Sequence, residues 1–591
     1  MNKEKFKKTI FNIFSLDFKK ARSILKNKIR KLKEIFKKSY QNIILFRRAF
    51  WFLIVFGVIF LLRLFLNLFT ETVPVPGGIY TEGVIGQPKF LNPIFAESSV
   101  DFDISYLIFS SLLKEKDKNF VGDLAESWEV SPDFKIYKII LKDNVFWHDG
   151  QKVTASDVIF TINLLNDPNY SGLFKGKFKN VAIKKIDDRT IQFTLKEPSA
   201  LFLKNLTFGI LPEHILGNMS FPKIIASSFN FNPIGTGPYK FTKSEVSEFG
   251  FIKSITLEVN ENWHFSKPYI KTIVFKFYSG ADDLLEAYKK REIMGISEIP
   301  LNLYKEAKDF SSLNIYRFSS PRYIGIFFNL DQRDEPTSFF EVRQALFYAL
   351  DRDKIIKELE IPFDIKENYY LFNSYLNDIK GFEYKYNPQK AKEILNNLGW
   401  VDNNNDGILE KNDKVLKISL TISEDPQVYF FAEKVASAWK EIGVDTEIQI
   451  LDSYNLSQVI SEGSYTVIIQ GVNLGWQFDP YYWWHSSQCG RGNLSCFKDN
   501  NIDKILTESQ KITDSSKRLN NYKIVFENLK QKLPVIPLIS VDLYYGVDKN
   551  LRGIEEKYIS YPYQRFSDIE NWYIDYIRVL KKFSLPGWRN W

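Results

Sequence analysis

Histidine and cysteine are scarce in this chain of 591 residues, which holds only four histidines and two cysteines. The histidines are far apart: His148, His214, His264 and His485. None has the spacing of a metal enzyme, and the phosphate loop, the dinucleotide-binding turn and the G-x-S-x-G nucleophile elbow are missing. Adjacent acids such as Asp282 and Asp283 are more typical of a solvated helix start than of a glycosidase pair. We therefore expect no enzyme and no cofactor.

Positive charge is concentrated at the N-terminus. Residues 1–48 contain 16 lysines and arginines against Glu4, Asp17 and Glu34, a net charge of +13, whereas the whole chain carries +8. Phe, Ile and Leu recur among these lysines at roughly helical spacing, as in a basic helix on anionic lipid. A basic arm is also typical of nucleic-acid binding, but the next segment favours a cytoplasmic arm beside a membrane.

That segment is a long apolar run. Residues 49–69 read AFWFLIVFGVIFLLRLFLNLF, and about 20 apolar residues suffice to cross a hydrocarbon core. Arg63, its one charge, lies where its side chain would reach the headgroups. A cleaved signal peptide has a shorter apolar region, and a buried core helix is the remaining alternative. The Lys and Arg excess before the run predicts a single-pass anchor at 49–70, with a cytoplasmic N-terminus and an extracytoplasmic main domain.

Cys489 and Cys496 both belong to the part expected outside, where disulfides persist. Six residues, GRGNLS, separate them. A metal site built with the nearby His485 would lack the usual four ligands. A local disulfide is therefore the preferred expectation.

Helical and strand-like patterns alternate beyond a short stiff stalk predicted at 71–78. The run TASDVIFTINLLN predicts a helix with Thr154 as its N-cap and Asp157 three residues on. Another helix is predicted in FFEVRQALFYALDRDKIIKEL, whose apolar residues share one stripe: Val342, Ala345, Leu346, Ala349 and Leu350. The chain is expected to be mixed α and β throughout.

Residues 402–413, DNNNDGILEKND, have the spacing of a twelve-residue calcium loop with its central glycine, Gly407. The side-chain ligands would be Asp402, Asn404, Asp406 and Asp413, with Glu410 as a ligand or water holder. The last position is Asp rather than the bidentate Glu, and a strand follows instead of a helix. An Asx-rich connecting loop is the alternative to a structural calcium site.

A set of segments occurs in one characteristic order over most of residues 79–545: PKFLNPIFAESSVDFDISYLIFSSLL, DLAESWEVSPDFKIYKIILKDNVFWHDGQKVTASDVIFTI, NPIGTGPYKF, YIGIFFNLDQ, YNPQKAKEILNNLGW, GWQFDP and LPVIPLI. Together they resemble the extracellular solute-binding protein family 5, the peptide-, nickel- and oligopeptide-binding components of ABC importers. In NPIGTGPYKF, Gly235 and Gly237 are expected to allow tight or left-handed backbone where the chain crosses between lobes.

The resemblance implies an α/β, two-lobed periplasmic-binding-protein-like fold with an extra subdomain, here preceded by one transmembrane helix. The expected boundaries are 1–48 for the basic arm, 49–70 for the anchor, 71–78 for the stalk, 79–320 for lobe I with an inserted subdomain at about 111–207, 321–536 for lobe II, and 537–591 for a return to lobe I and a tail. Such a protein captures a peptide or oligopeptide between its lobes and delivers it to ABC permease and ATPase subunits. It would break no bond and bind no nucleic acid.

The resemblance also suggests ligand-binding residues. Asp479, three residues after Trp476, matches the aspartate that anchors the peptide's amino group in peptide-binding members; the alternative is a turn before Pro480. Two further candidates, Glu97 and Ser98, match the loop that lobe I brings to the ligand. Trp476 and Tyr482 would line an apolar wall, or equally belong to the core or to a packing lid.

Other functions remain open, because one fold serves several solutes. The ligand could be a nickel chelate, an oligosaccharide or an opine, although histidine poverty counts against nickel. A surface sensor and an exported hydrolase are the alternatives of another class.

Overall fold

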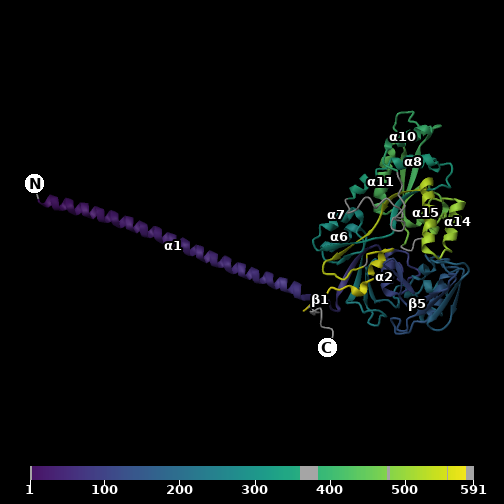
Figure 1. Ribbon diagram of the computed structural model, residues 1–591, viewed down its shortest axis with the longest axis horizontal. Coiled ribbons are helices and arrows are strands. Elements are labelled where there is room, and N and C mark those ends of the chain that lie inside the picture. Colours follow the sequence, from purple (N-terminus) through teal and green to yellow (C-terminus); the bar gives the residue numbers. More distant parts are fainter. Residues whose placement is uncertain (1–2, 360–383, 476–478, 556, 581–591) are drawn as a thin grey trace. The chain divides into compact units, whose positions relative to one another are not determined.

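The computed structural model describes residues 3–359, 384–475, 479–555 and 557–580, with the side chains of the long N-terminal helix described only in part. The chain divides into two compact units (Figure 1). The N-terminal unit comprises residues 1–75 and 576–591, and the main unit comprises residues 76–575.

The N-terminal unit consists of helix α1 (Lys3–Phe69) and a two-stranded antiparallel ladder of β1 (Thr70–Pro74) and β22 (Tyr576–Leu580). The stalk predicted at 71–78 is therefore wrong as a bare linker, because its first residues pair with a strand from the end of the chain. The predicted span at 49–70 lies at the end of α1. Among the residues that the structure describes, no helix has both the length and the apolarity required to cross a membrane.

Sheet I of the main unit has seven strands in the order β13-β21-β12-β2-β11-β10-β9. Its central strand β2 runs parallel to both neighbours, β11 and β12, and the other strand pairs are antiparallel. The strands are β2 (Gly77–Ile85), β9 (Tyr239–Val246), β10 (Ile252–Val259), β11 (Ile270–Tyr278), β12 (Gly295–Ile296), β13 (Leu313–Phe318) and β21 (Leu543–Asp548).

Sheet II has five strands in the order β18-β17-β19-β14-β20, of which β17 runs parallel to both β18 and β19. The strands are β14 (Arg322–Phe328), β17 (Lys417–Ser423), β18 (Asp445–Leu451), β19 (Val467–Asn473) and β20 (Val535–Ser540). The sequence predicts that the chain returns to lobe I at residue 537, but β20 belongs to sheet II as far as Ser540. The chain re-enters sheet I only at Leu543.

A smaller antiparallel sheet, β5-β6-β8-β7, lies within the predicted subdomain range of 111–207. Its strands are β5 (Ala125–Val130), β6 (Ile136–Leu141), β7 (Val181–Lys185) and β8 (Thr190–Leu195). Two hairpins, β3 (Leu113–Lys116) with β4 (Asn119–Gly122) and β15 (Glu410–Lys411) with β16 (Lys414–Val415), complete the β structure.

Helices surround these sheets, and α8, α10 and α11 lie together at the end of the main unit opposite β5 (Figure 1). They are α2 (Ser99–Ile108), α3 (Ala155–Leu165), α4 (Glu213–Leu216), α5 (Phe221–Ile225), α6 (Ala281–Lys289), α7 (Tyr304–Lys308), α8 (Phe340–Tyr348), α9 (Arg352–Glu358), α10 (Pro388–Asn397), α11 (Pro426–Lys440), α12 (Ser453–Glu462), α13 (Tyr481–Trp484), α14 (Asn500–Ser509) and α15 (Ser515–Lys532).

Two local predictions are confirmed. Thr154 caps α3, and Asp157 returns a hydrogen bond to the backbone N–H of Thr154, a complete capping box. The residues of the predicted stripe are each at most 2% exposed, although the single predicted helix is divided into α8, which ends at Tyr348, and α9, which Asp351 caps. The two hydrophobic cores follow the sheets: one combines sheet I with the smaller sheet, and the other extends from sheet II to α6 and α7.

The glycines of NPIGTGPYKF serve a different purpose from the one predicted. Neither Gly235 nor Gly237 is in the left-handed region, and the segment leads into β9 of sheet I rather than across between sheets. A Cβ at either position would overlap carbonyl oxygens at the end of α2. The Gly237 N–H donates to the carbonyl of Ile108 at 2.8 Å. Close backbone approach, not unusual φ, therefore requires glycine here.

Candidate functional site

A cavity of about 850 Å³ lies where strands of both sheets end. Its lining includes Ile85 at the end of β2, Ser279 after β11, Glu424 after β17 and Asn473 at the end of β19. Ligands of open α/β sheets bind at the carboxyl ends of strands. The volume is within the range of roughly 300–1,000 Å³ typical of ligand pockets.

The chain passes between the two sheets twice beside this cavity, after β13 and after β20. Asp542, in the second passage, accepts hydrogen bonds from the Arg317 side chain at 2.5 Å and from the Ser320 backbone at 3.2 Å. Arg322, at the start of β14, pairs with Glu298 at 3.4 Å, and both line the cavity. Polar contacts thus hold the two passages together.

A fully buried ionic cluster supports one side of the cavity. Arg565, 0% exposed, donates to Glu82 of β2 and to both oxygens of Asp103 of α2 at 2.6–3.1 Å. Burial raises the pKa of both carboxyls, and the charge of Arg565 opposes that rise. Tyr80 and Tyr545 also donate to Glu82. The sequence analysis missed this cluster, because nothing in the spacing of these residues brings them together.

Asp479 lies beside a second cavity of about 310 Å³. Its residue exposure is 9%, and its carboxylate accepts hydrogen bonds from Lys204 at 3.3 Å, Gln510 at 3.2 Å and the Tyr481 N–H at 3.1 Å. Tyr482 also lines this cavity and is 48% exposed. The structure therefore brings Asp479 and Tyr482 to one cavity. Trp476 lies outside the described residues.

The two candidates from lobe I have local partners. The Ser98 hydroxyl caps α2 by accepting from the Asp101 N–H, and the Glu97 carboxylate pairs with Lys89 at 3.7 Å in an exposed position. The next residue, Ser99, lines the 850 Å³ cavity. Ser98 thus acts as a helix cap at the border of that cavity.

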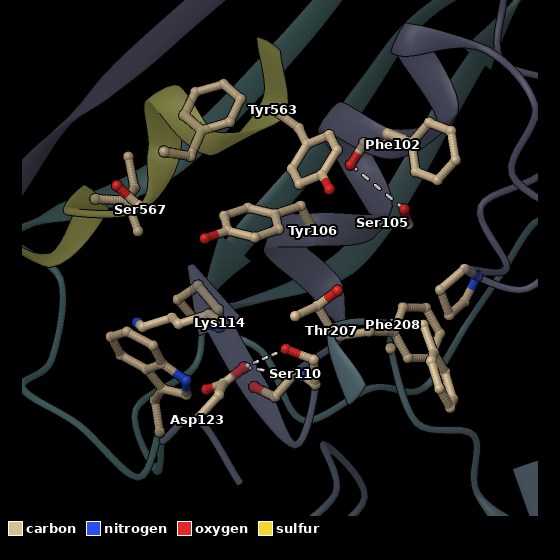
Figure 2. Close-up of a pocket in the computed structure, with 18 of the residues that line it drawn as sticks. Phe102, Ser105, Tyr106, Ser110, Lys114, Asp123, Thr207, Phe208, Tyr563 and Ser567 are labelled. Carbon is tan, nitrogen blue, oxygen red and sulfur yellow. Dashed lines mark hydrogen bonds between the residues drawn. The ribbon is translucent and has the colours of Figure 1, made fainter. Parts of the chain in front are cut away.

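A third, small pocket of about 70 Å³ lies between α2, the β3 region and the C-terminal segment. Figure 2 shows the rings of Tyr106 and Tyr563 facing one another, with Lys114 and Asp123 across the pocket. The two tyrosine centroids are 5.1 Å apart. Asp123 is buried and accepts from His264 and the Ser111 backbone; these bonds and nearby Lys114 lower its pKa despite burial.

The structure brings together three of the acids named for the predicted calcium loop. Carboxylate oxygens of Asp402, Asp406 and Glu410 lie within 4.8 Å of one another, and Asp413 is not part of that group. Glu410 accepts from the Asn403 N–H at 3.0 Å, and Asn404 bonds to Asp406. Oδ1 of Asp402 is buried and has no hydrogen-bond partner.

Cys489 and Cys496 are joined by a disulfide. It closes the loop between the 310 Å³ cavity and α14. His485, considered above as a metal ligand beside these cysteines, instead shares hydrogen bonds with Ser487 and Thr507.

Comparison with known proteins identifies relatives over most of the chain. The family model described as "Bacterial extracellular solute-binding proteins, family 5 Middle" matches residues 119–493. The oligopeptide-binding protein AppA of Bacillus subtilis is 28% identical over 515 residues, covering 85% of this chain and 92% of AppA. The dipeptide-binding protein of Escherichia coli is 23% identical, covering 79% of this chain and 90% of its own length.

Solved structures have the same fold. AppA from Bacillus subtilis, in complex with a nonapeptide, superposes with a TM-score of 0.72 and covers 86% of this chain and all of its own. NikZ from Campylobacter jejuni, in complex with Ni(L-His), is 26% identical with a TM-score of 0.71, covering 84% of this chain and 99% of its own. The two-lobed α/β architecture of the main unit is thus that of these binding proteins.

Proposed function

The chain belongs to the bacterial extracellular solute-binding proteins of family 5, and we propose that it captures a peptide or oligopeptide and delivers it to an ABC-type permease. The observation that carries the proposal is the 850 Å³ cavity at the strand ends of both sheets. A chain similar over its whole length, AppA, binds a nonapeptide.

Asp479, which lines the second cavity of about 310 Å³, would bind the peptide's α-ammonium. A buried carboxylate such as that of Asp479 forms charge-assisted hydrogen bonds with an ammonium group, which are shorter and stronger than neutral ones. The aromatic side chain of Tyr482 beside it would pack against the first residues of the peptide. No bond is made or broken in this function, so the protein would act by binding alone.

Binding would stabilise the arrangement in which both lobes contact the ligand. A ligand shifts a conformational equilibrium only by its differential affinity for the two states. The two chain passages between sheets I and II, tied by Asp542, are the place for such a hinge. ABC permease and ATPase subunits would then receive the peptide.

We further propose that residues 49–70 anchor the protein in the cell membrane, with the N-terminus cytoplasmic and the main unit extracytoplasmic. The supporting observations are the 21-residue apolar run after a segment of charge +13 and the exposure of its aromatic and aliphatic side chains, such as Phe52 at 76% and Leu53 at 68%. Carbonate washing of membranes tests this proposal: the full chain should stay in the pellet, and a chain lacking residues 1–70 should not.

A structural calcium ion in the 402–413 loop is a separate proposal. The support is the orphan Oδ1 of Asp402 next to the carboxylates of Asp406 and Glu410, since oxygen ligands suit calcium. Calcium should raise the melting temperature of the wild type and not that of Asp402→Asn. Equal melting curves in calcium and in chelator would contradict it.

The likeness to NikZ suggests a metal chelate as the second candidate ligand. Two of the histidines are committed to carboxylates: His214 to Asp149 at 2.8 Å and His264 to Asp123 at 3.2 Å. These contacts leave little histidine for a chelated metal and favour the peptide.

Mass spectrometry of ligands that co-purify with the full chain tests the peptide proposal, together with melting curves in pools of free peptides. A ligand that binds only the folded state raises the melting temperature. We expect peptides in the purified protein and a higher melting temperature in the pools. Absence of peptides in both measurements would overturn the proposal.

A further inference from the structure

The carboxylate proposed to bind the ligand already has a cation. Nζ of Lys204 lies 3.3 Å from Oδ2 of Asp479, and Gln510 donates to the same oxygen at 3.2 Å. The other oxygen accepts from the Tyr481 N–H. A carboxylate has about four acceptor positions, so these three donors leave one for a ligand.

Lys204 is held near Asp479 by more than its own charge. It lies on the 3-10 helix η1 (Phe202–Leu206), which follows the smaller sheet. The segment before η1 contacts the end of α14 twice. The Ala200 N–H donates to the Gln510 carbonyl at 3.4 Å, and Lys511 pairs with Glu197 at 3.4 Å. These contacts keep the backbone of η1 beside Asp479.

The side chain of Lys204 is less constrained than that backbone. It is 38% exposed, whereas the side chain of Asp479 is 8% exposed. A lysine side chain is a flexible stem with a strongly hydrated ammonium group. Nζ can therefore move into water at small cost, while the carboxylate stays in place, bonded to Gln510 and to the Tyr481 N–H.

We propose that Lys204 competes with the amino group of the ligand for Asp479 and so determines how strongly the protein prefers a free amino terminus. The inference rests on the proposed function. Two ammonium groups on one carboxylate repel each other, so an arriving α-ammonium takes the place of Nζ. The binding free energy therefore gains only the difference between the interaction of the α-ammonium with Asp479 and that of Lys204 with Asp479.

A peptide with a blocked amino terminus makes no such exchange. It leaves the Lys204–Asp479 pair intact, so its affinity is only slightly lower than that of a peptide with a free amino terminus. Lys204 therefore makes the wild type tolerant of blocked or internal peptide ends. Removal of the lysine charge makes the same site selective for a free amino terminus.

Calorimetry on the full chain in detergent tests this inference with two probes, a pool of nonapeptides with free amino termini and the same pool N-acetylated. The measured quantity is the ratio of the two dissociation constants, acetylated over free. In Lys204→Met we expect this ratio to rise roughly tenfold above that of the wild type, as expected for an unopposed hydrogen bond between charged groups. Lys204→Arg retains the charge and should keep the wild-type ratio.

Lys152→Met is the matched control, because it removes the lysine of another partly exposed Lys–Asp pair, Lys152 with Asp143 at 2.7 Å, which is not among the contacts that hold η1. Its ratio should equal that of the wild type. A ratio in Lys204→Met equal to or below that of the wild type overturns the inference while the proposed function stands. If neither pool binds to the wild type, the proposed function fails and the inference fails with it.

Discussion

Two sets of carboxylates border cavities of this protein: Glu82 with Asp103, and Asp479. The cations that pair with them differ in burial and in the number of carboxylates they contact. Arg565 is fully buried, bonds to two carboxylates and joins β2, α2 and the C-terminal segment around sheet I. Lys204 is 38% exposed, bonds to one carboxylate and connects η1 to the segment after β19. The first contact stabilises a cavity wall, and the second is exchangeable. An ion pair between a basic and an acidic side chain can thus stabilise the fold when it is fully buried, or take part in ligand recognition when its cation is partly exposed.

The largest expected effect follows from removal of the buried cation. Arg565→Met leaves the buried carboxylates of Glu82 and Asp103 without the cation that pairs with both, which costs on the order of 3–5 kcal/mol. Urea unfolding of the full chain measures this loss as a lower midpoint. A midpoint within error of the wild type would show that the cluster is not structural, and the comparison with Lys204 would lose its basis.

An intermediate effect is expected from acid, through a partly buried histidine near sheet I. His148 accepts from the Gly235 N–H at Nδ1, and its Nε2–H donates to the Gly237 carbonyl. The bond at Nδ1 requires that this nitrogen carry no proton, whereas Nε2–H can donate to the Gly237 carbonyl in either charge state. Burial lowers the pKa of His148 to about 4, from an ordinary value of 6.5.

Between pH 6.5 and 4 the unfolded chain therefore binds more protons at this residue than the folded chain. The stability that His148 contributes is complete above pH 6.5 and falls by about 3 kcal/mol as the pH drops toward 4. The difference in unfolding free energy between the wild type and His148→Gln isolates this residue from Glu82 and Asp103, whose raised pKa values act in the opposite direction. A difference independent of pH would contradict the neutral ring.

The smallest effect is expected at the exchangeable pair. Lys204→Met should change the unfolding free energy of the ligand-free chain by less than about 1 kcal/mol, the value of partly exposed ion pairs. Urea unfolding alongside Arg565→Met gives the comparison directly. A loss as large as that of Arg565→Met would make Lys204 a structural residue.

Local features of the fold were accessible to sequence reasoning. The capping box of Thr154 and the buried stripe of α8 depend on residues within one turn or one face of a single helix. The course of NPIGTGPYKF could not be predicted in this way. Its glycines are needed because the backbone passes close to the end of α2, which lies more than a hundred residues earlier in the sequence. The later end of β20 likewise depends on its pairing with β14.

Some residues of the candidate site could likewise be predicted from the sequence, and others could not. Asp479 and Tyr482 were predicted from a motif and lie together at one cavity, whereas Ser98 is committed to a helix cap. Lys204 and Arg565 left no signal in the sequence, since their partners are 275 and up to 483 residues away.

By itself the sequence determined the family, the mixed α/β architecture and the charge and hydropathy pattern of the N-terminus, because these depend on order, spacing and composition along the chain. The tertiary structure alone decided which cation each acid receives and how buried the pair becomes. Burial sets the cost of exchanging a charged partner, so it is tertiary contact that makes Arg565 a fixed support and Lys204 a competitor for the ligand.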